Sequence, residues 1–123
     1  TGRPRRVGAF DVVASSYGCV MQAATEIALT KLDVLDVMDK IPVCVSYNVD
    51  GREVKDFPSG EALNKATPNI VYMDGWKTST ADVRRYEDLP KNARKYIEFI
   101  EAAVGCKIKY VSVGAKREAI IVR

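Results

Sequence analysis

Apolar residues recur at helical spacing in two parts of the chain. Across residues 9–24 they fall every three or four positions, which predicts a helix with one buried stripe. A second run, over residues 88–104, includes Pro90, whose fixed φ suits a first helical turn, and is followed by Gly105, which suits a helix end. Its predicted buried face is Ala93, Tyr96, Ile97, Ile100 and Val104. We therefore expect two amphipathic helices.

Strict alternation replaces this spacing in residues 42–49. One face of that extended segment would carry Val43, Val45, Tyr47 and Val49, and the other Cys44, Ser46 and Asn48. The dipeptide Asp50-Gly51 follows, and residues 52–57 would form the second strand of the pair. An Asp-Gly pair between two such runs is a strong signal for a two-residue turn, so the pattern predicts a β-hairpin.

Shorter apolar runs complete the expected secondary structure. They predict strands over residues 27–29, 68–73, 108–113 and 119–122, and one helical turn over residues 61–65. Residues 1–8 and 74–85 are polar and are expected to be exposed loops. The order of helix, strand, hairpin, strand, helix, strand and strand mixes parallel crossovers with an antiparallel hairpin, which indicates an α/β or α+β fold.

The excess positive charge lies at the N-terminus. Without Arg3, Arg5 and Arg6, the 19 basic residues become 16, which balance the 16 acidic ones. This balance argues against a nucleic-acid surface and favours one local anion site. No apolar run approaches the roughly 18 residues that cross a bilayer, and no signal peptide follows TGRPRR, so we expect a cytoplasmic protein without a membrane partner. The chain lacks an initiator Met, which indicates a fragment.

Cysteine and histidine usage excludes several kinds of site. Cys19, Cys44 and Cys106 are widely spaced in apolar surroundings and form no CxxC pair, so we expect free buried thiols rather than zinc ligands or disulfides. The chain has no His, which removes Ser-His and Cys-His catalysis. Any general acid or base must be another residue type or lie outside this chain.

The stretch Thr30-Lys31-Leu32-Asp33 is a candidate for recognising a purine base. On an extended chain, Lys31 and Asp33 would point to the same side and could converge on one flat ligand. An ionised carboxylate only accepts hydrogen bonds, so it would match the two neighbouring donors of guanine, N1–H and the N2 amino group. Adenine would leave that carboxylate unpaired. Taken alone, this tetrapeptide is more often the polar end of a buried strand.

Two further segments suit the same kind of ligand. Ser112-Val113-Gly114 follows a predicted strand, where a glycine lets backbone amides approach a base, although alone it is more often a plain turn. Thr1-Gly2-Arg3-Pro4-Arg5-Arg6 offers forked guanidinium donors to a small anion, and the alternative is a frayed basic terminus. Residues 77–80 are a weaker polar cluster that we expect on the surface, with Trp76 packing beside it.

These stretches, in this order, resemble the C-terminal part of adenylosuccinate synthetase. The resemblance runs through TGRPRRVGAFD at residues 1–11, LTKLDVLD at residues 29–36, VCVSY at residues 43–47, Gly75-Trp76, Asp88-Leu89-Pro90, Ala93, Tyr96-Ile97 and Ser112-Val113-Gly114. It covers nearly the whole chain. Several motifs in one order are far more specific than any one of them.

The resemblance implies a GTP-dependent ligase of purine biosynthesis. The family joins inosine monophosphate (IMP) to L-aspartate and gives adenylosuccinate, GDP and phosphate, with Mg²⁺ as cofactor and a homodimer as the assembly. It implies an aspartate and IMP loop containing Thr1, Gly2, Arg3 and Arg5, and GTP contacts from Arg5, Lys31, Leu32, Asp33, Ser112, Val113 and Gly114. No catalytic residue or metal ligand is expected in this segment, because the family's phosphate loop, catalytic Asp and His, and Mg²⁺ ligands precede it.

The expected fold is α/β, with residues 1–123 as one C-terminal segment of a larger mixed, mostly parallel sheet with flanking helices and a β-hairpin. The sequence differs from the family pattern at Ala115, where many relatives have proline after the glycine of the third motif. Two alternatives stay open: a catalytically inactive guanine-nucleotide-binding or interaction module of the same fold, and a small α/β domain of unrelated function. We expect the isolated segment to be inactive and to associate through exposed strand edges.

Overall fold

The structure is a computed structural model that describes residues 2–4 and 7–123. Its strands are β1 (Phe10–Asp11), β2 (Glu26–Leu29), β3 (Lys40–Val49), β4 (Arg52–Val54), β5 (Thr67–Asp74), β6 (Lys107–Ser112) and β7 (Ile120–Val122). Its helices are α1 (Val12–Met21), α2 (Gly60–Lys65), α3 (Lys91–Val104) and the 3-10 helices η1 (Leu32–Leu35) and η2 (Tyr86–Asp88). Every predicted helix and strand is present, with shifted ends. None of the helices in the described ranges is long and apolar enough to cross a bilayer.

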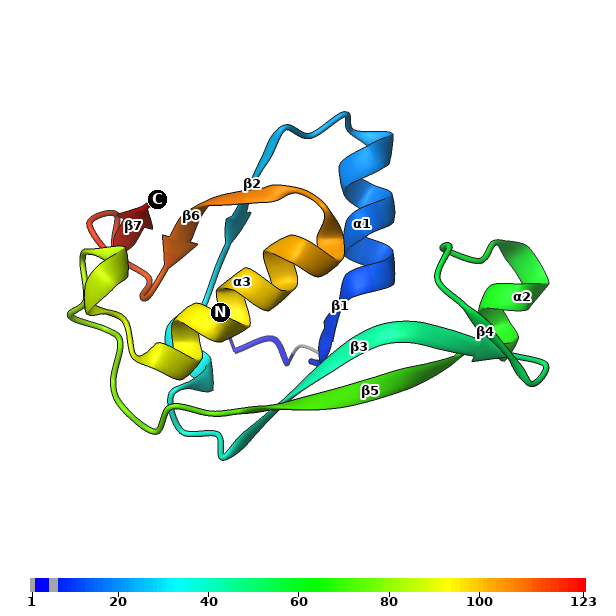
Figure 1. Cartoon of the computed structure of the whole chain (residues 1–123), viewed down its shortest axis with the longest axis horizontal. Coiled ribbons are helices and arrows are strands. Elements are labelled where there is room, and N and C mark those ends of the chain that lie inside the picture. The colour runs from blue at the N-terminus through cyan, green and yellow to red at the C-terminus, as the bar shows by residue number, and fades with distance from the viewer. Residues whose placement is uncertain (1, 5–6) are drawn as a thin grey trace.

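The strands form two sheets, and each sheet contains parallel and antiparallel pairs. In the first, β3 pairs in parallel with β1 and antiparallel with β4 and β5. In the second, β6 lies between the parallel β2 and the antiparallel β7. Figure 1 shows β3 and β5 as a long ribbon that carries β4 and α2 away from the rest of the fold. The predicted α/β class with a hairpin is confirmed.

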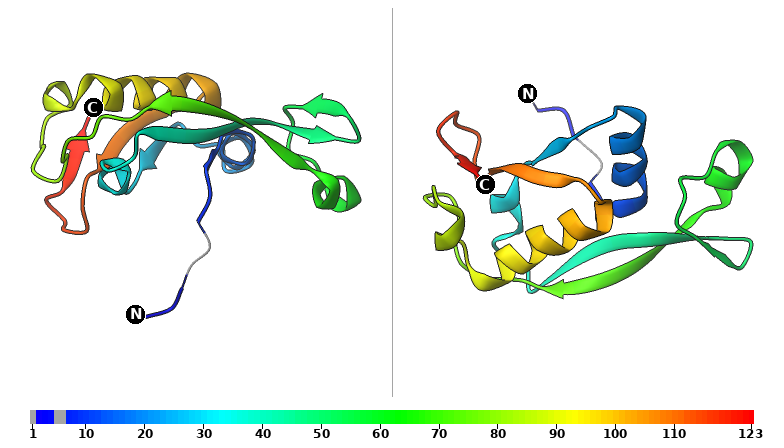
Figure 2. Two further views of the ribbon diagram at one scale, coloured as in Figure 1. Left: turned by 90° about the horizontal axis from the view of Figure 1, so that it is seen from below. Right: turned by 45° about the horizontal axis from the view of Figure 1, so that its top comes forward.

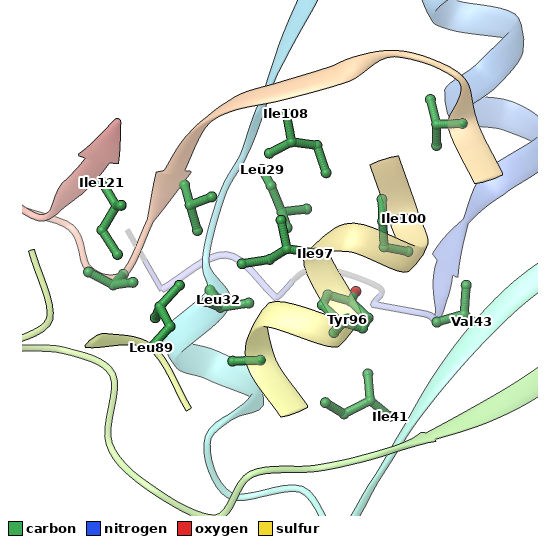
Figure 3. Close-up of a cluster of buried hydrophobic side chains, with 14 of the residues drawn as sticks. Leu29, Leu32, Ile41, Val43, Leu89, Tyr96, Ile97, Ile100, Ile108 and Ile121 are labelled. Carbon is green, nitrogen blue, oxygen red and sulfur yellow. The ribbon is translucent and has the colours of Figure 1, made fainter. Parts of the chain in front are cut away.

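Helix α3 lies at the centre of the main hydrophobic core. All five residues of its predicted buried face are buried, and they pack with apolar side chains of β2, β3, β6 and η1 (Figure 3). Ile97 and Ile100 are fully enclosed, and burying such a side chain stabilises the fold by about 1.5–3 kcal/mol. The helix ends at Gly105, whose φ of 74° lies in the left-handed region that favours glycine.

Helix α1 is more exposed than its spacing predicts. The prediction of one buried stripe over residues 9–24 is wrong beyond the start of the helix, because only Val12 and Val13 of α1 are buried. Tyr17, Val20 and Met21 lie on the surface, and Val20 is 75% exposed. Exposed apolar side chains that cluster in this way are typical of an interaction surface.

A bulge in β3 breaks the predicted alternation. The pairing of β3 with β5 shifts register between Cys44 and Ser46, so residues beyond the shift change faces. Val43 packs in the main core, whereas Tyr47 lies with Cys44 in a second cluster that includes Val13. The prediction that Val43 and Tyr47 share one face is therefore wrong.

The hairpin turn itself is confirmed. Asp50 and Gly51 have positive φ angles of 49° and 82°, as a two-residue primed turn requires. The Gly51 N–H donates to Asn48 Oδ1 at 3.0 Å. The return strand β4 ends at Val54, earlier than predicted. On the same edge of β3, Val43 and Cys44 pair with β1, while β5 pairs along the other edge.

The three cysteines are free thiols, as predicted. Cys44 and Cys106 are buried, whereas Cys19 is only half-buried. Burial raises the pKa of the Cys44 thiol, which disfavours the reactive thiolate. These cysteines are therefore part of the packing.

Candidate functional site

Asp33 lies on a short helix that continues from β2. After Leu29 the chain passes through Lys31, whose φ of 62° and ψ of 37° are left-handed, and then forms η1. The Leu32 side chain is buried in the main core and anchors this helix. Because the backbone is not extended here, the prediction that Lys31 and Asp33 point to the same side of a strand is wrong.

Asp33 and Gly114 line the same hollow, although they are far apart in the sequence. The hollow has a volume of about 340 Å³, which is within the range of small-ligand pockets. Its other lining residues are Ala81, Asp82, Arg84, Val113, Ala115, Lys116 and Ala119. The two segments meet because they follow β2 and β6, which are parallel neighbours and end at one edge of their sheet.

One carboxylate oxygen of Asp33, Oδ1, is buried without a hydrogen-bond donor among the described residues. Such an orphaned acceptor costs about 1–3 kcal/mol. This carboxylate therefore favours a ligand that brings N–H or O–H donors, and two adjacent donors on a flat molecule would satisfy both its oxygens.

The turn after β6 is closed by its own hydrogen bonds. Ser112 Oγ donates to the Gly114 carbonyl at 2.9 Å, and the Val113 N–H donates to the Ala119 carbonyl at 2.9 Å. A Cβ on Gly114 would lie 3.1 Å from the Ala119 Cβ, which is closer than ordinary van der Waals contact. Glycine thus lets the turn close. Val113 and Gly114 line the hollow, whereas Ser112 does not.

Lys31 borders a different hollow. It shares with Leu32 an apolar hollow of about 530 Å³, which residues 7–10 and Tyr96 also line. Burial raises the pKa of Tyr96 to about 12, so its hydroxyl stays protonated at neutral pH. Lys31 and Asp33 therefore face two separate hollows, and the structure does not bring Lys31 next to Gly114.

The polar segment after β5 is partly buried, contrary to the prediction of an exposed loop over residues 74–85. The Asp36 carboxylate accepts hydrogen bonds from Trp76 Nε1 at 2.6 Å, from the Thr80 N–H at 2.7 Å and from Thr80 Oγ1 at 2.9 Å. Thr80 has 0% of its surface exposed. Trp76 packs against Tyr96, in the packing role predicted for it.

This buried segment forms a further side of the Asp33 site. Ala81 lines the hollow shared with Gly114, and it also lines a neighbouring hollow of about 490 Å³ between Asp33 and residues 77–79. Sequence reasoning missed Asp36, Thr80 and Ala81. The signals for them were weak: Thr80 belonged to a polar cluster expected on the surface, and Trp76 was a large apolar residue inside a polar run.

Charges of both signs border the Asp33 hollow. Arg84 Nη1 donates to two carbonyls of its own loop at 2.6 and 2.8 Å, which holds the guanidinium in place. Lys116 and Asp82 also line the hollow. The two basic side chains beside Asp33 suit a ligand that combines hydrogen-bond donors with negative charge.

Residues 2–4, the described part of the predicted anion loop, lie apart from this site. Gly2, Arg3 and Pro4 are exposed, and Figure 2 shows this segment extending away from the rest of the fold. Thr1 and Arg5, which were predicted to bind substrate, lie outside the described residues. Arg3 is not among the residues that line the Asp33 hollow.

Comparisons with known proteins point to one family. The family model described as adenylosuccinate synthetase matches residues 1–121. The adenylosuccinate synthetases of Chlorobium phaeobacteroides and Coprinopsis cinerea are each 43% identical, over 100% of this chain and 29% of their own length. The chain thus spans less than a third of the curated relatives it matches.

A solved structure shares the fold. The structure of fully ligated adenylosuccinate synthetase from Plasmodium falciparum aligns with a TM-score of 0.92 and 32% identity. The alignment covers 98% of this chain and 30% of that one. The two sheets and their helices therefore match a segment of that larger structure.

Proposed function

The chain belongs to the adenylosuccinate synthetase family, and we propose that it supplies the guanine-recognition site of a GTP-dependent ligase. In this proposal the longer protein joins IMP to L-aspartate and yields adenylosuccinate, GDP and phosphate. The observation that carries the proposal is the buried, unpartnered Asp33 Oδ1 beside a hollow that Gly114 also lines. Family membership supports the reaction, and this geometry supports the part that the chain plays in it.

Asp33 selects guanine by matching its donors. The N1–H and N2 amino groups lie side by side on one edge of guanine, and an ionised carboxylate presents two acceptors that can take both. Adenine has an acceptor at N1 and no 2-amino group. It would leave the buried oxygen unpaired and bring a lone pair against a negative charge, so ATP is rejected.

The turn at residues 112–114 borders the base beside Asp33. Gly114 has no side chain, so its backbone can approach the ligand closely. Val113 adds apolar surface to the hollow, and Ser112 supports the turn through its bond to the Gly114 carbonyl. Ala115 also lines the hollow, so its difference from the proline of many relatives bears directly on ligand contact.

Lys31 and Leu32 are two further proposed GTP contacts in this chain. The buried Leu32 side chain fixes the position of η1 and hence of Asp33. The Lys31 stem covers one face of the base while its ammonium stays in water. For this contact the Lys31 side chain must turn from the apolar hollow toward Asp33 when the nucleotide binds.

Residues 1–5 are proposed to hold the other two substrates. The guanidinium groups of Arg3 and Arg5 match the carboxylates of aspartate through forked hydrogen bonds, and Arg3 also lies against IMP while Arg5 reaches toward GTP. Thr1 adds a hydroxyl, and Gly2 lets the backbone come close. Such a loop orients the aspartate amine for attack on the purine after GTP has phosphorylated its 6-oxygen.

Phosphoryl transfer is assigned to the rest of the protein. In the described ranges, no group of three or more His, Cys, Asp or Glu side chains could hold a metal ion, so the Mg²⁺ that the family implies has no proposed ligand here. The chain alone is proposed to be inactive. The longer protein is proposed to be a cytoplasmic homodimer, and its mass by light scattering at low concentration tests the dimer.

Replacing Asp33 in the full-length protein tests the guanine role. Asp33→Asn keeps the side-chain size but exchanges one acceptor for a donor, so the preference for GTP over ATP in kcat/KM should fall by roughly a hundredfold. Asp74→Asn is the matched control, because Asp74 is exposed and pairs with Lys40 away from the hollow. Unchanged discrimination in Asp33→Asn would refute the role. A full-length protein that binds GTP but forms no adenylosuccinate would favour the inactive binding module.

A further inference from the structure

Two carboxylates one helical turn apart on η1 have opposite hydrogen-bonding states. Asp33 has a buried oxygen without a donor among the described residues. Asp36, at the C-terminal cap of the same helix, has both oxygens bonded to protein donors. The first is arranged to meet a ligand. The second is committed to holding another part of the chain.

Asp36 holds the segment that follows β5. Its oxygens lie 2.6 Å from Trp76 Nε1, 2.7 Å from the Thr80 backbone nitrogen and 2.9 Å from Thr80 Oγ1. Hydrogen bonds to an ionised acceptor are shorter and stronger than neutral ones. Because Thr80 is fully buried, solvent cannot replace these bonds if Asp36 is lost.

The wall of the Asp33 hollow continues from Thr80. Ala81 follows directly and lines the hollows on both sides of Asp33. The Val83 N–H donates to the Thr80 carbonyl at 3.0 Å, which starts the next turn. The Arg84 guanidinium then donates to the Ala81 carbonyl at 2.6 Å. A shift of Thr80 would therefore move the whole segment that faces Asp33.

We propose that Asp36 is a positioning residue for guanine recognition. Its carboxylate holds residues 80–84 against η1 and so fixes one wall of the hollow in which Asp33 meets the base. The inference rests on the proposed guanine role of Asp33. Asp36 acts through Thr80 and Trp76 and does not touch the nucleotide.

The test is the steady-state kinetics of full-length variants, with KM measured separately for GTP, IMP and aspartate. Asp36→Asn keeps the side-chain size but places an amide donor against the donors of Thr80 and Trp76. It should raise the KM for GTP by about tenfold and leave the other two KM values and kcat unchanged. A merely structural role would lower the melting temperature without this selective change.

Two substitutions at Thr80 give a milder version of the same test. Thr80→Val removes the hydroxyl and keeps the backbone N–H, so the KM for GTP should rise by about threefold. Thr80→Ser keeps both donors and should restore the wild-type value. Asp74→Asn, at the start of the same segment, is the matched control and should change nothing.

Several results would overturn the inference. A wild-type KM for GTP in soluble Asp36→Asn is one, and an equal rise of all three KM values is another. If Asp36→Asn does not fold, equal GTP KM values for Thr80→Val and Thr80→Ser reject it. Asp33→Asn, assayed in parallel, separates the two proposals. If the KM for GTP does not rise in Asp33→Asn, the guanine role itself is refuted. If it rises in Asp33→Asn but not in Asp36→Asn, only the positioning role of Asp36 is refuted.

Discussion

The Asp33 site and the N-terminal segment differ in how firmly the fold holds their side chains. Asp33 sits on a helix anchored by buried Leu32, next to a closed turn and to a segment held by Asp36. Arg3, by contrast, is exposed on a stretch without helix or strand. A preorganised site loses little conformational entropy on binding, whereas an exposed loop must gain its contacts from the ligand and its surroundings. Under the proposed function, the contacts for guanine would already be in place in this fold, whereas the contacts for aspartate would need more than this fold supplies.

Replacing Asp33 by alanine should cause the largest change, and this change should be confined to the KM for GTP. Asp33→Ala in the full-length protein removes both acceptors from the hollow and should raise the KM for GTP by a hundredfold or more, at about 1.4 kcal/mol per factor of ten. The KM for aspartate should not change, because Arg3 is not among the residues that line this hollow. Steady-state kinetics with each substrate varied in turn measures both. A parallel rise in the two KM values would remove the distinction between the regions.

The converse variant is Arg3→Ala. Loss of one forked ion pair to a carboxylate should raise the KM for aspartate by about tenfold and leave the KM for GTP unchanged. Arg3→Lys keeps the charge but loses the forked geometry, so it should recover only part of the affinity. Full recovery by lysine would mean that charge alone, and not the fork, binds aspartate.

Replacing one glycine in each region by alanine should affect the KM for GTP in only one of the two cases. Gly114→Ala brings a Cβ to 3.1 Å from Ala119 in the closed turn, so the KM for GTP should rise by about threefold. An added Cβ at Gly2 meets nothing within 4 Å, although its φ of +66° disfavours alanine. Gly2→Ala should leave the KM for GTP unchanged in the same assay. Equal rises in the KM for GTP in the two variants would contradict the placement of the base beside Gly114.

The smallest expected effect lies away from both regions, at the Glu101–Arg123 ion pair. Burial alone would raise the pKa of Glu101, but the Arg123 guanidinium at 2.7 Å and the Ile108 N–H lower it from 4.5. A lowered folded pKa adds stability above pH 4.5, and this stability is lost as the pH falls through the folded value. Glu101→Gln should cost about 1 kcal/mol at neutral pH and change no KM.

Thermal melting of the full-length protein checks this prediction. The difference in melting temperature between wild type and Glu101→Gln should be largest near neutral pH and should shrink below pH 4.5. A difference that stays constant into the acid range would show that the charge of Glu101 is not what stabilises the fold.

The sequence predicted those parts of the fold that depend only on residues close together in the chain. The spacing of Tyr96, Ile97 and Ile100 identified the buried face of α3, and Asp50-Gly51 identified the hairpin turn. In both cases the cause lies within a few residues of the chain. Helical periodicity and positive φ need no knowledge of distant partners.

The remaining features depend on distant partners. The bulge after Cys44 arises from pairing with β5, and the exposed face of α1 has the same periodicity as a buried one. In the site, Asp33 and Gly114 could be proposed from short motifs. Asp36 could not, because its donors Trp76 and Thr80 lie 40 and 44 residues away in the sequence.

A crystal structure of the full-length protein with bound GDP is the sharpest test of whether Asp33 binds guanine. The guanine base should lie in the hollow between Asp33 and Gly114, with N1 and N2 each about 2.7–3.2 Å from a carboxylate oxygen of Asp33. A base bound elsewhere, with Asp33 Oδ1 instead bonded to a donor from the rest of the protein, would contradict the guanine role of Asp33.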